Sequence, residues 1–183
     1  MAKSKTAAPK GVKSVAKKEA TQKAAPIKAV AKKTTVRSAA DKKKEPTINI
    51  KYTDKSAGQP ELLAIFEAIK KMMLPYDKKR HLVLHAATGG QANLVSHKPV
   101  EIDGRKRNEL WFVSALVQKG YVGFYYTPVY MQGELKKHFS EDFVKSLKGK
   151  ACFHIKKNDP VIMADIRKAI KVGYEAFIER GWI

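Results

Sequence analysis

The aromatic residues of this chain are confined to its C-terminal part, and this limits where a hydrophobic core can form. All sixteen Phe, Tyr and Trp residues lie at or after Tyr52, in a chain of 183 residues. A segment that is rich in charge and holds no aromatic side chain cannot bury enough apolar surface to offset the entropy lost when its backbone is ordered. We therefore predict that residues 1–46, the basic segment, are disordered, and that residues 47–183 form one domain.

The charge of the chain is also distributed unevenly. The formal net charge is +20, of which residues 1–46 contribute +11, from 14 Lys and Arg residues against three acids, and residues 47–183 contribute +9. Lysine is a compact, hydrated point charge on a flexible stem, so it suits phosphate groups better than base edges. We expect the basic segment to bind nucleic acid, most readily duplex DNA, without sequence preference. The alternatives are a tail that only improves solubility and a segment that serves anchoring or targeting.

The predicted phosphate contacts combine the basic segment with a basic triplet farther along the chain. In the segment they are Lys3, Lys5, Lys10, Lys13, Lys17, Lys18, Lys23, Lys28, Lys32, Lys33, Arg37, Lys42, Lys43 and Lys44. The triplet is Arg105, Lys106 and Arg107, in the string GRKRN, and we expect it at the tip of a β-hairpin. There it would either add phosphate contacts or remain an ordinary solvated loop.

Residues after the basic segment alternate between helix and strand patterns. Apolar residues recur at helical spacing after Pro60 and again after Asp159, which is a good N-cap residue ahead of Pro160. Strands are predicted over 81–86, 92–102, 108–118, 121–128 and 151–156, with a loop at 103–107 and a short helix that Ser140 caps. This order predicts an α+β domain. Its antiparallel β-sheet would have about five strands, with N- and C-terminal helices packed on one face.

Several strings of this domain resemble the YdhG-like family, a bacterial domain of poorly defined function. The most telling are YTPVY (Tyr126–Tyr130) and LKGKACFHIKK (Leu147–Lys157), and the resemblance covers about residues 57–181. It implies a fold like that of frataxin, and it implies as an alternative function an iron or small-ligand carrier. Such iron carriers present an acidic helix face, whereas the matching helix here offers only Glu61 and Glu67, beside Lys70 and Lys71.

The Lys/Ala/Pro-rich composition of the basic segment resembles the tails of linker histones and of histone-like bacterial proteins. With the single Cys152, which allows no intrachain disulfide, this favours a reducing, cytoplasmic and nucleoid-associated setting. No apolar run reaches the ~20 residues that span a bilayer, and the basic segment lacks the Trp, Phe and Leu of a membrane-surface helix. We expect no membrane partner. The domain is expected to bind an unknown ligand or protein partner.

Groups suited to catalysis or metal binding are sparse. Cys152 and His154 share a face of a predicted strand without an orienting acid, and a buried free cysteine is the commoner case. His81 and His85 would lie about 13 Å apart on a strand, too far to share one zinc ion. The string TGGQ (Thr88–Gln91) lacks the Gly-Lys-Ser/Thr of a nucleotide-binding loop, so we expect a turn. We therefore expect no enzyme activity, no cofactor and no metal.

Aromatic residues of the predicted sheet suggest a ligand pocket. Its candidate residues are Trp111, Tyr126, Tyr130 and Lys150. Strand alternation places Tyr125 on one face of the sheet and both Phe124 and Tyr126 on the other, so at least one set packs against helices. Stacking of bases on these rings, as on a single-strand binding platform, is the alternative to core packing.

Overall fold

The computed structural model describes residues 52–86 and 89–183. The basic segment, the predicted domain boundary at 46–47 and part of the TGGQ string lie outside these residues. In chain order the elements are α1 (Pro60–Met73), the 3₁₀ turn η1 (Leu74–Tyr76), β1 (Leu82–Ala86), β2 (Gln91–Ser96), β3 (Val100–Ile102), β4 (Arg105–Arg107), β5 (Leu110–Gln118), β6 (Tyr121–Tyr126), α2 (Thr127–Met131), η2 (Gly133–His138), α3 (Glu141–Lys145), β7 (Leu147–Lys148), β8 (Cys152–Ile155) and α4 (Pro160–Glu179).

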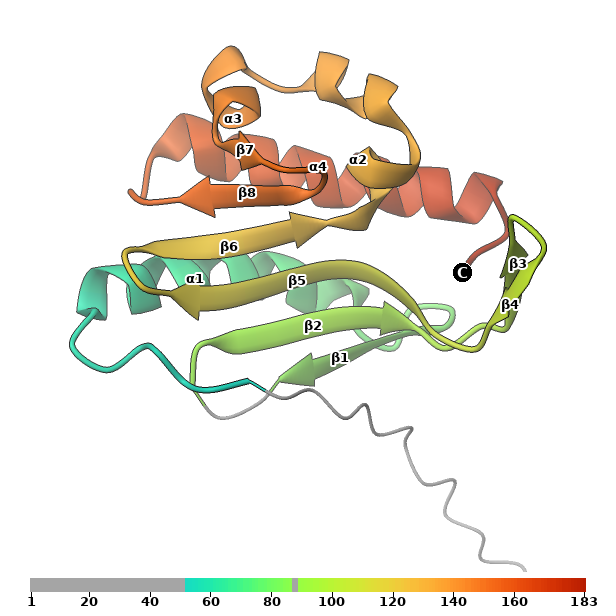
Figure 1. Cartoon of the computed structure of the whole chain (residues 1–183), viewed down its shortest axis with the longest axis horizontal. Helices are drawn as coiled ribbons and strands as arrows, with labels where there is room; N and C mark the ends of the chain where they lie inside the picture. Colours follow the sequence, from blue (N-terminus) through green and yellow to red (C-terminus); the bar gives the residue numbers. More distant parts are fainter. Residues whose placement is uncertain (1–51, 87–88) are drawn as a thin grey trace, which may run out of the picture. The chain divides into compact units, whose positions relative to one another are not determined.

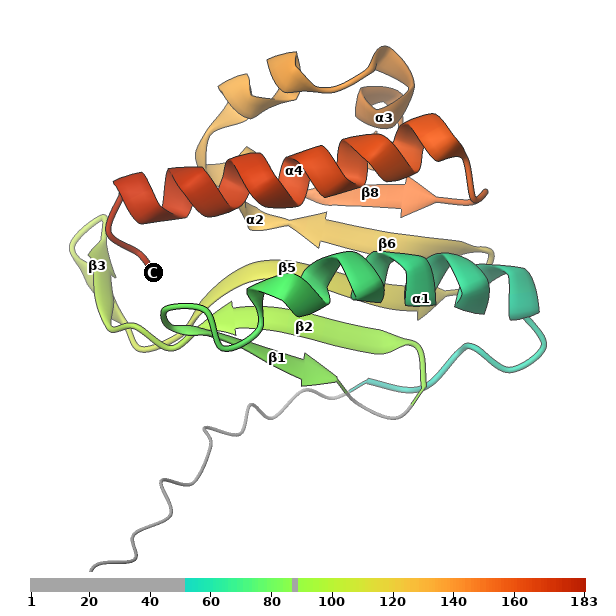
Figure 2. The same cartoon turned by 180° about the vertical axis from the view of Figure 1, so that it is seen from behind.

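The main sheet has six strands in the order β1-β2-β5-β6-β8-β7, and all neighbours are antiparallel. The two long helices, α1 and α4, lie together on one face, which we call the covered face (Figure 2). The opposite, open face is turned toward the viewer in Figure 1. The predicted α+β class, the antiparallel sheet and the terminal helices on one face are therefore confirmed, and the sheet has six strands where about five were expected.

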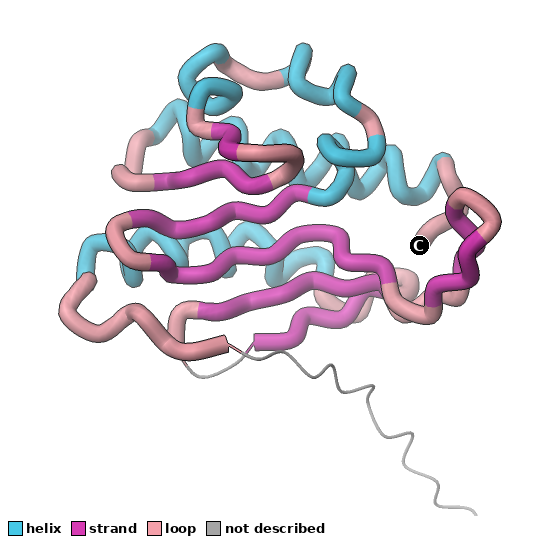
Figure 3. Tube along the Cα trace, in the orientation of Figure 1, coloured by secondary structure: helices cyan, strands magenta, loops and turns pink. Residues whose placement is uncertain are grey.

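The prediction was wrong between residues 92 and 107. One long strand was expected over 92–102, but β2 ends at Ser96 and β3 pairs with β4 in a separate two-stranded sheet (Figure 3). Pro99 separates the two strands, because proline offers no backbone N–H to a ladder. The expected loop forms β4 instead, after a turn in which Asp103 and Gly104 take φ angles of 52° and 71°, as in a type I′ hairpin. The basic triplet is thus a strand beside the turn and not the tip itself.

The covered face is built from aromatic side chains. Phe112, Phe124 and Phe153 are fully buried on β5, β6 and β8, and the ring of Phe112 lies 4.9 Å from that of Phe177 on α4. Burying a large aromatic side chain is among the strongest contributions to a core. The covered face therefore forms the hydrophobic core of the domain.

Tyr126 also belongs to the covered face. It is fully buried, and its hydroxyl donates a hydrogen bond of 2.7 Å to the carbonyl oxygen of Ala169 on α4. Gly173, one turn along α4, makes room for it, since a Cβ at that position would lie 2.6 Å from the hydroxyl oxygen. The sequence hypothesis that placed Tyr126 in a ligand pocket is wrong, because strand alternation turns this side chain toward the helices.

A β-bulge interrupts the pairing of β2 with β5. Leu94 pairs with Val113 and Val95 pairs with Trp111, so Phe112 is an extra residue on β5. Phe112 and Val113 consequently both join the core cluster. Trp111 and Ser114, three residues apart, both line a cavity on the open face.

Candidate functional site

Two rows of side chains cross the open face, because residues that pair directly in antiparallel strands share a face. The first row contains His85, Asn93, Ser114, Tyr125 and Cys152, one from each of β1, β2, β5, β6 and β8. The second row contains Gln91, Leu116, Gly123 and His154. The middle of the open face therefore mixes polar, aromatic and small residues, in contrast to the aromatic covered face.

A cavity of about 360 Å³ opens among these rows, and we call it the open-face cavity. Its lining residues are Gln91, Asn93, Trp111, Ser114, Leu116, Tyr125, Thr127 and Ala151. Gln91 and Asn93 are each only 1% exposed, whereas Trp111 and Tyr125 are 39% and 37% exposed. The amides thus lie deep, and the two aromatic rings lie nearer the solvent.

Two side-chain polar atoms of residues that line this cavity have no hydrogen-bond partner. They are Nε2 of Gln91, a donor, and Oδ1 of Asn93, an acceptor, and both are shielded from solvent. Buried polar atoms are nearly always paired in folded proteins, and leaving one unpaired costs about 1–3 kcal/mol. Both such atoms among the described residues belong to Gln91 and Asn93, which line the same cavity, so the fold tolerates this cost at one place.

The groups around the cavity are uncharged at neutral pH. Burial, with smaller effects of neighbouring Cys152 and Tyr121, raises the pKa of Tyr125 to about 12. Burial also raises the pKa of the Cys152 thiol, and the hydrogen bond from Tyr125 offsets only part of this. Cys152 therefore stays a thiol, which is the unreactive form of the side chain.

His154 lies on the open face with Cys152, as strand alternation predicts. Its ring stacks on Tyr121 with centroids 3.8 Å apart. Burial, followed by repulsion from Lys148 and Lys156, lowers the pKa of His154. The imidazole is therefore neutral at pH 7 and is held by stacking rather than poised beside a nucleophile.

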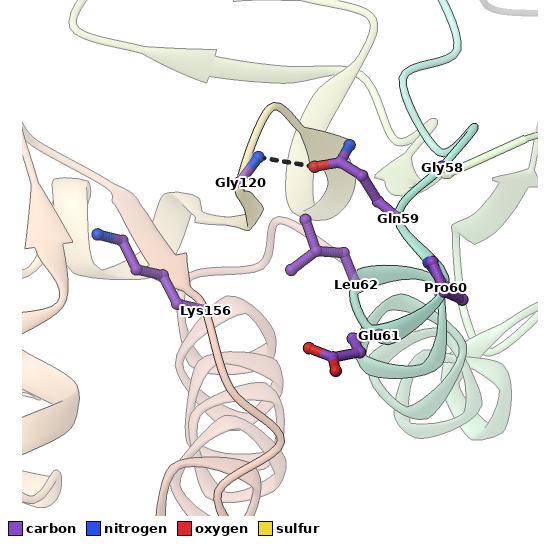
Figure 4. A pocket seen from close by; sticks show the side chains of 7 residues that line it. All are labelled: Gly58, Gln59, Pro60, Glu61, Leu62, Gly120 and Lys156. Carbon is purple, nitrogen blue, oxygen red and sulfur yellow. Dashed lines mark hydrogen bonds between the residues drawn. The ribbon is translucent and has the colours of Figure 1, made fainter.

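A second cavity, of about 460 Å³, lies at the start of α1 (Figure 4). It is lined by Gly58, Gln59, Pro60, Glu61, Leu62, Gly120 and Lys156. The Gln59 carboxamide serves the fold here, since its oxygen accepts a hydrogen bond of 2.8 Å from the Gly120 N–H and its nitrogen donates to the Gln118 carbonyl. The Gln59 carboxamide is thus engaged in holding α1 to the β5–β6 turn, whereas the open-face cavity is lined by residues with unpaired amide atoms, so the open-face cavity is the better candidate site.

The residues of the sequence-predicted pocket are not brought together. Trp111 lines the open-face cavity, whereas Tyr126 lies in the core. Tyr130 is 55% exposed and pairs with Lys150, whose Nζ lies 5.5 Å from the ring centroid in a cation–π contact. The amides Gln91 and Asn93 were missed, because a polar residue at an alternate strand position reads the same whether it faces solvent or a cavity.

His81 and His85 were expected to lie too far apart to share one zinc ion, and in the structure His85 meets a different histidine. His81 precedes β1, and His85 instead meets His97, with the two Nε2 atoms 2.9 Å apart. Nδ1 of His97 lies 3.8 Å from Oε1 of Glu109. Within 52–86 and 89–183, no three His, Cys, Asp or Glu side chains are grouped so that they could hold a metal ion.

Comparison with protein-family models, with curated proteins and with solved structures gives no match. The resemblance to the YdhG-like family therefore rests on the strings quoted above and stays a prediction. Among the helices of the described ranges, none combines the length and the apolar composition that crossing a bilayer requires.

Proposed function

We propose that this chain is a non-enzymatic protein that binds nucleic acid without sequence preference, through phosphate contacts of the basic segment. The observation that carries the proposal is the division of charge: +11 falls on 46 residues that contain no aromatic side chain. Such a segment has little to contribute to a core, and its lysines match the closely spaced negative charges of a polynucleotide. Cytoplasmic, nucleoid-associated placement of the protein belongs to the same proposal.

The basic triplet of β4 supports the proposal from the folded domain. All three side chains are exposed, on a hairpin separate from the main sheet (Figure 1). Because side chains alternate along a strand, Arg105 and Arg107 point to one side of the hairpin and Lys106 to the other. Two of the three cations can therefore meet one phosphate backbone together, and the triplet would add about two contacts.

The test is the salt dependence of binding to a duplex of random sequence. If the full chain contacts about ten phosphates, log K falls against log salt with a slope near −9. Replacing the 14 basic residues of the basic segment by Gln should abolish most of the affinity and most of the slope. A chain whose basic segment is scrambled in order but unchanged in composition is the matched control, and it should bind like the native chain.

Retention of affinity and slope by the Gln-substituted chain would contradict the proposal. A smaller step tests the hairpin: the double substitution of Arg105 and Arg107 to Ala should reduce the slope by about 2, since each lost phosphate contact removes about 0.9. Substituting Lys136 and Lys137 of η2 to Ala removes the same charge from another exposed site and tells a specific contact from a general charge effect.

Carriage of a small ligand is the second candidate function. One observation favours it, the open-face cavity with its unpaired amide atoms. Iron carriage gains no such support: α1 pairs its acid Glu67 with Lys70 at 3.4 Å, so its surface is not uniformly acidic.

A further inference from the structure

The open-face cavity has the chemistry of a ligand site. We infer that it binds one uncharged, planar heterocycle that presents a hydrogen-bond acceptor beside a donor, as the edge of a nucleobase does. This inference goes beyond the phosphate contacts proposed for the basic segment, because it concerns the domain and a neutral ring.

The unpaired amide atoms determine what the ligand must offer. Nε2 of Gln91 requires an acceptor, and Oδ1 of Asn93 requires a donor. These residues are neighbours on the same face of β2, with Ala92 between them turned toward the core. Both atoms are shielded from solvent, so the two amides must turn toward the cavity to meet a ligand. A ligand that then supplies both groups on one edge removes both desolvation costs at once, and a site of this kind rejects analogues that lack the groups.

The lining also determines the charge of the ligand. The eight lining residues contain no acidic or basic side chain. A phosphate or a carboxylate would enter this cavity without a counter-charge, beside amides that are almost fully buried. The phosphate groups of a nucleotide must therefore remain outside, and the part that enters is neutral.

The aromatic rings favour a flat ligand. Trp111 on β5 and Tyr125 on β6 border the cavity and are each more than a third exposed, so a part of each ring is free to be covered. Bases of any identity stack favourably on such rings. The apolar side chains of Leu116 and Ala151 complete a lining that suits the faces of a heterocycle.

The space limits the ligand to about one base or nucleoside. A volume of about 360 Å³ is near the lower end of small-ligand pockets, which run from about 300 to 1,000 Å³. Gly123 on β6 leaves the Tyr125 ring its place, since a Cβ there would lie 2.9 Å from that ring. A bulkier residue at 123 would displace the ring that borders the cavity.

An ordered water is the rival occupant, because buried waters commonly satisfy isolated polar groups. The test uses the full chain, with uridine, cytidine, adenosine and guanosine as probes and ribose as the control that lacks a base. The side-chain NH₂ signals of Gln91 and Asn93 are followed by NMR in about 1 M salt, where phosphate contacts are screened within about 3 Å. We expect at least one nucleoside to shift both signals and ribose to shift neither.

Two nearly isosteric variants show whether the amides hold the ligand. Gln91→Met and Asn93→Leu should each weaken nucleoside binding at least tenfold, since each leaves a ligand group unpaired. The matched controls Gln132→Met and Asn158→Leu make the same chemical changes at other sites and should leave affinity unchanged. Circular dichroism and unfolding curves identify a variant that fails to fold. In that case Trp111→Ala, which removes a stacking ring at a half-exposed position, tests the same site and should also weaken nucleoside binding.

A free nucleoside and a base within a single strand are two sources of the same chemistry. If a short single strand competes with the nucleoside and a duplex does not, the base of a polynucleotide is the ligand; if neither competes, the free nucleoside is. Both outcomes support the inference. It is overturned if no nucleoside moves the two NH₂ signals at millimolar concentration, if ordered water alone occupies the site, or if the control variants lose affinity equally. This measurement does not use the Gln-substituted basic segment. Failure of the proposed phosphate binding and failure of the inferred nucleoside binding can therefore be told apart.

Discussion

The two faces of the main sheet differ in how completely their buried polar groups are paired. On the covered face, buried aromatic rings meet α1 and α4, and the buried Tyr126 hydroxyl has its partner at 2.7 Å. On the open face, buried amides from β2 lie beside half-exposed rings, and two of their atoms are unpaired. Unpaired polar atoms are a cost to folding, and their concentration on one face is the observation on which the proposed ligand site rests.

The comparison predicts first that neighbouring aromatic residues on β6 differ in their contribution to stability. Phe124→Ala should lower the free energy of unfolding by about 3–5 kcal/mol, because it empties a fully buried site in the core. Tyr125→Ala, one residue along and 37% exposed, is the matched control and should cost clearly less. Urea unfolding curves measure both. Equal losses would show that the open face also carries the fold.

A substitution at Gly173 on α4 should cause the next largest loss of stability. Gly173→Ala places a methyl group 2.6 Å from the Tyr126 hydroxyl oxygen and 2.8 Å from Pro128 Cγ, which should cost about 1–3 kcal/mol although Ala is the better helix former. Tyr126→Phe removes the crowded hydroxyl. In that background the same substitution should cost less, and a double-mutant cycle in thermal or urea unfolding measures the coupling. No coupling would place the strain elsewhere.

Substitutions of two buried polar residues of β2 should change the free energy of unfolding by smaller amounts. The Ser96 hydroxyl donates a buried hydrogen bond of 2.8 Å to the Trp182 carbonyl, so Ser96→Ala should cost about 1 kcal/mol or more. Asn93→Leu replaces a group whose Oδ1 has no partner, and it should change the free energy of unfolding by less than about 1 kcal/mol. A loss of several kcal/mol in Asn93→Leu would show that this amide supports the fold.

The smallest expected effect is the contribution of His154 to the pH dependence of stability. The pKa of His154 is lowered in the folded state, so this side chain binds a proton more readily in the unfolded chain. The contribution of His154 to stability is therefore complete above its ordinary pKa of about 6.5, and it declines as the pH falls below that value. NMR titration should place the His154 midpoint below that of an ordinary histidine. His154→Gln should flatten the decline of unfolding free energy below pH 6.5 relative to the native chain. A midpoint above 6.5 would contradict the assigned environment.

The fold was largely predictable because its signals are local. Pro60 begins α1, and Asp159 caps α4 by accepting hydrogen bonds from the Val161 and Ile162 N–H groups, as its position ahead of Pro160 indicated. The strands β1, β2, β5 and β6 were predicted from the alternation of apolar residues. The short elements β3, β4 and β7 were missed, because two or three residues are too few to show a period.

The candidate site was less predictable because it depends on register across strands. Gln91 and Asn93 come from β2, while Trp111 and Tyr125 come from β5 and β6, and no local string brings them together. His97 meets His85 for the same reason, through the pairing of β1 with β2. A single sequence gives the faces of each strand but not which residues meet across them.

The bulge in β5 has an evolutionary consequence. Phe112 has no pairing partner on β2, so it adds an aromatic ring to the covered face. Trp111 and Ser114 keep their places on the open face. Shortening the chain at this point would thin the packing beneath α4 and leave the opposite surface intact, whereas shortening it elsewhere in β5 would exchange inside for outside. The two sides of the strand can thus vary independently at this one position.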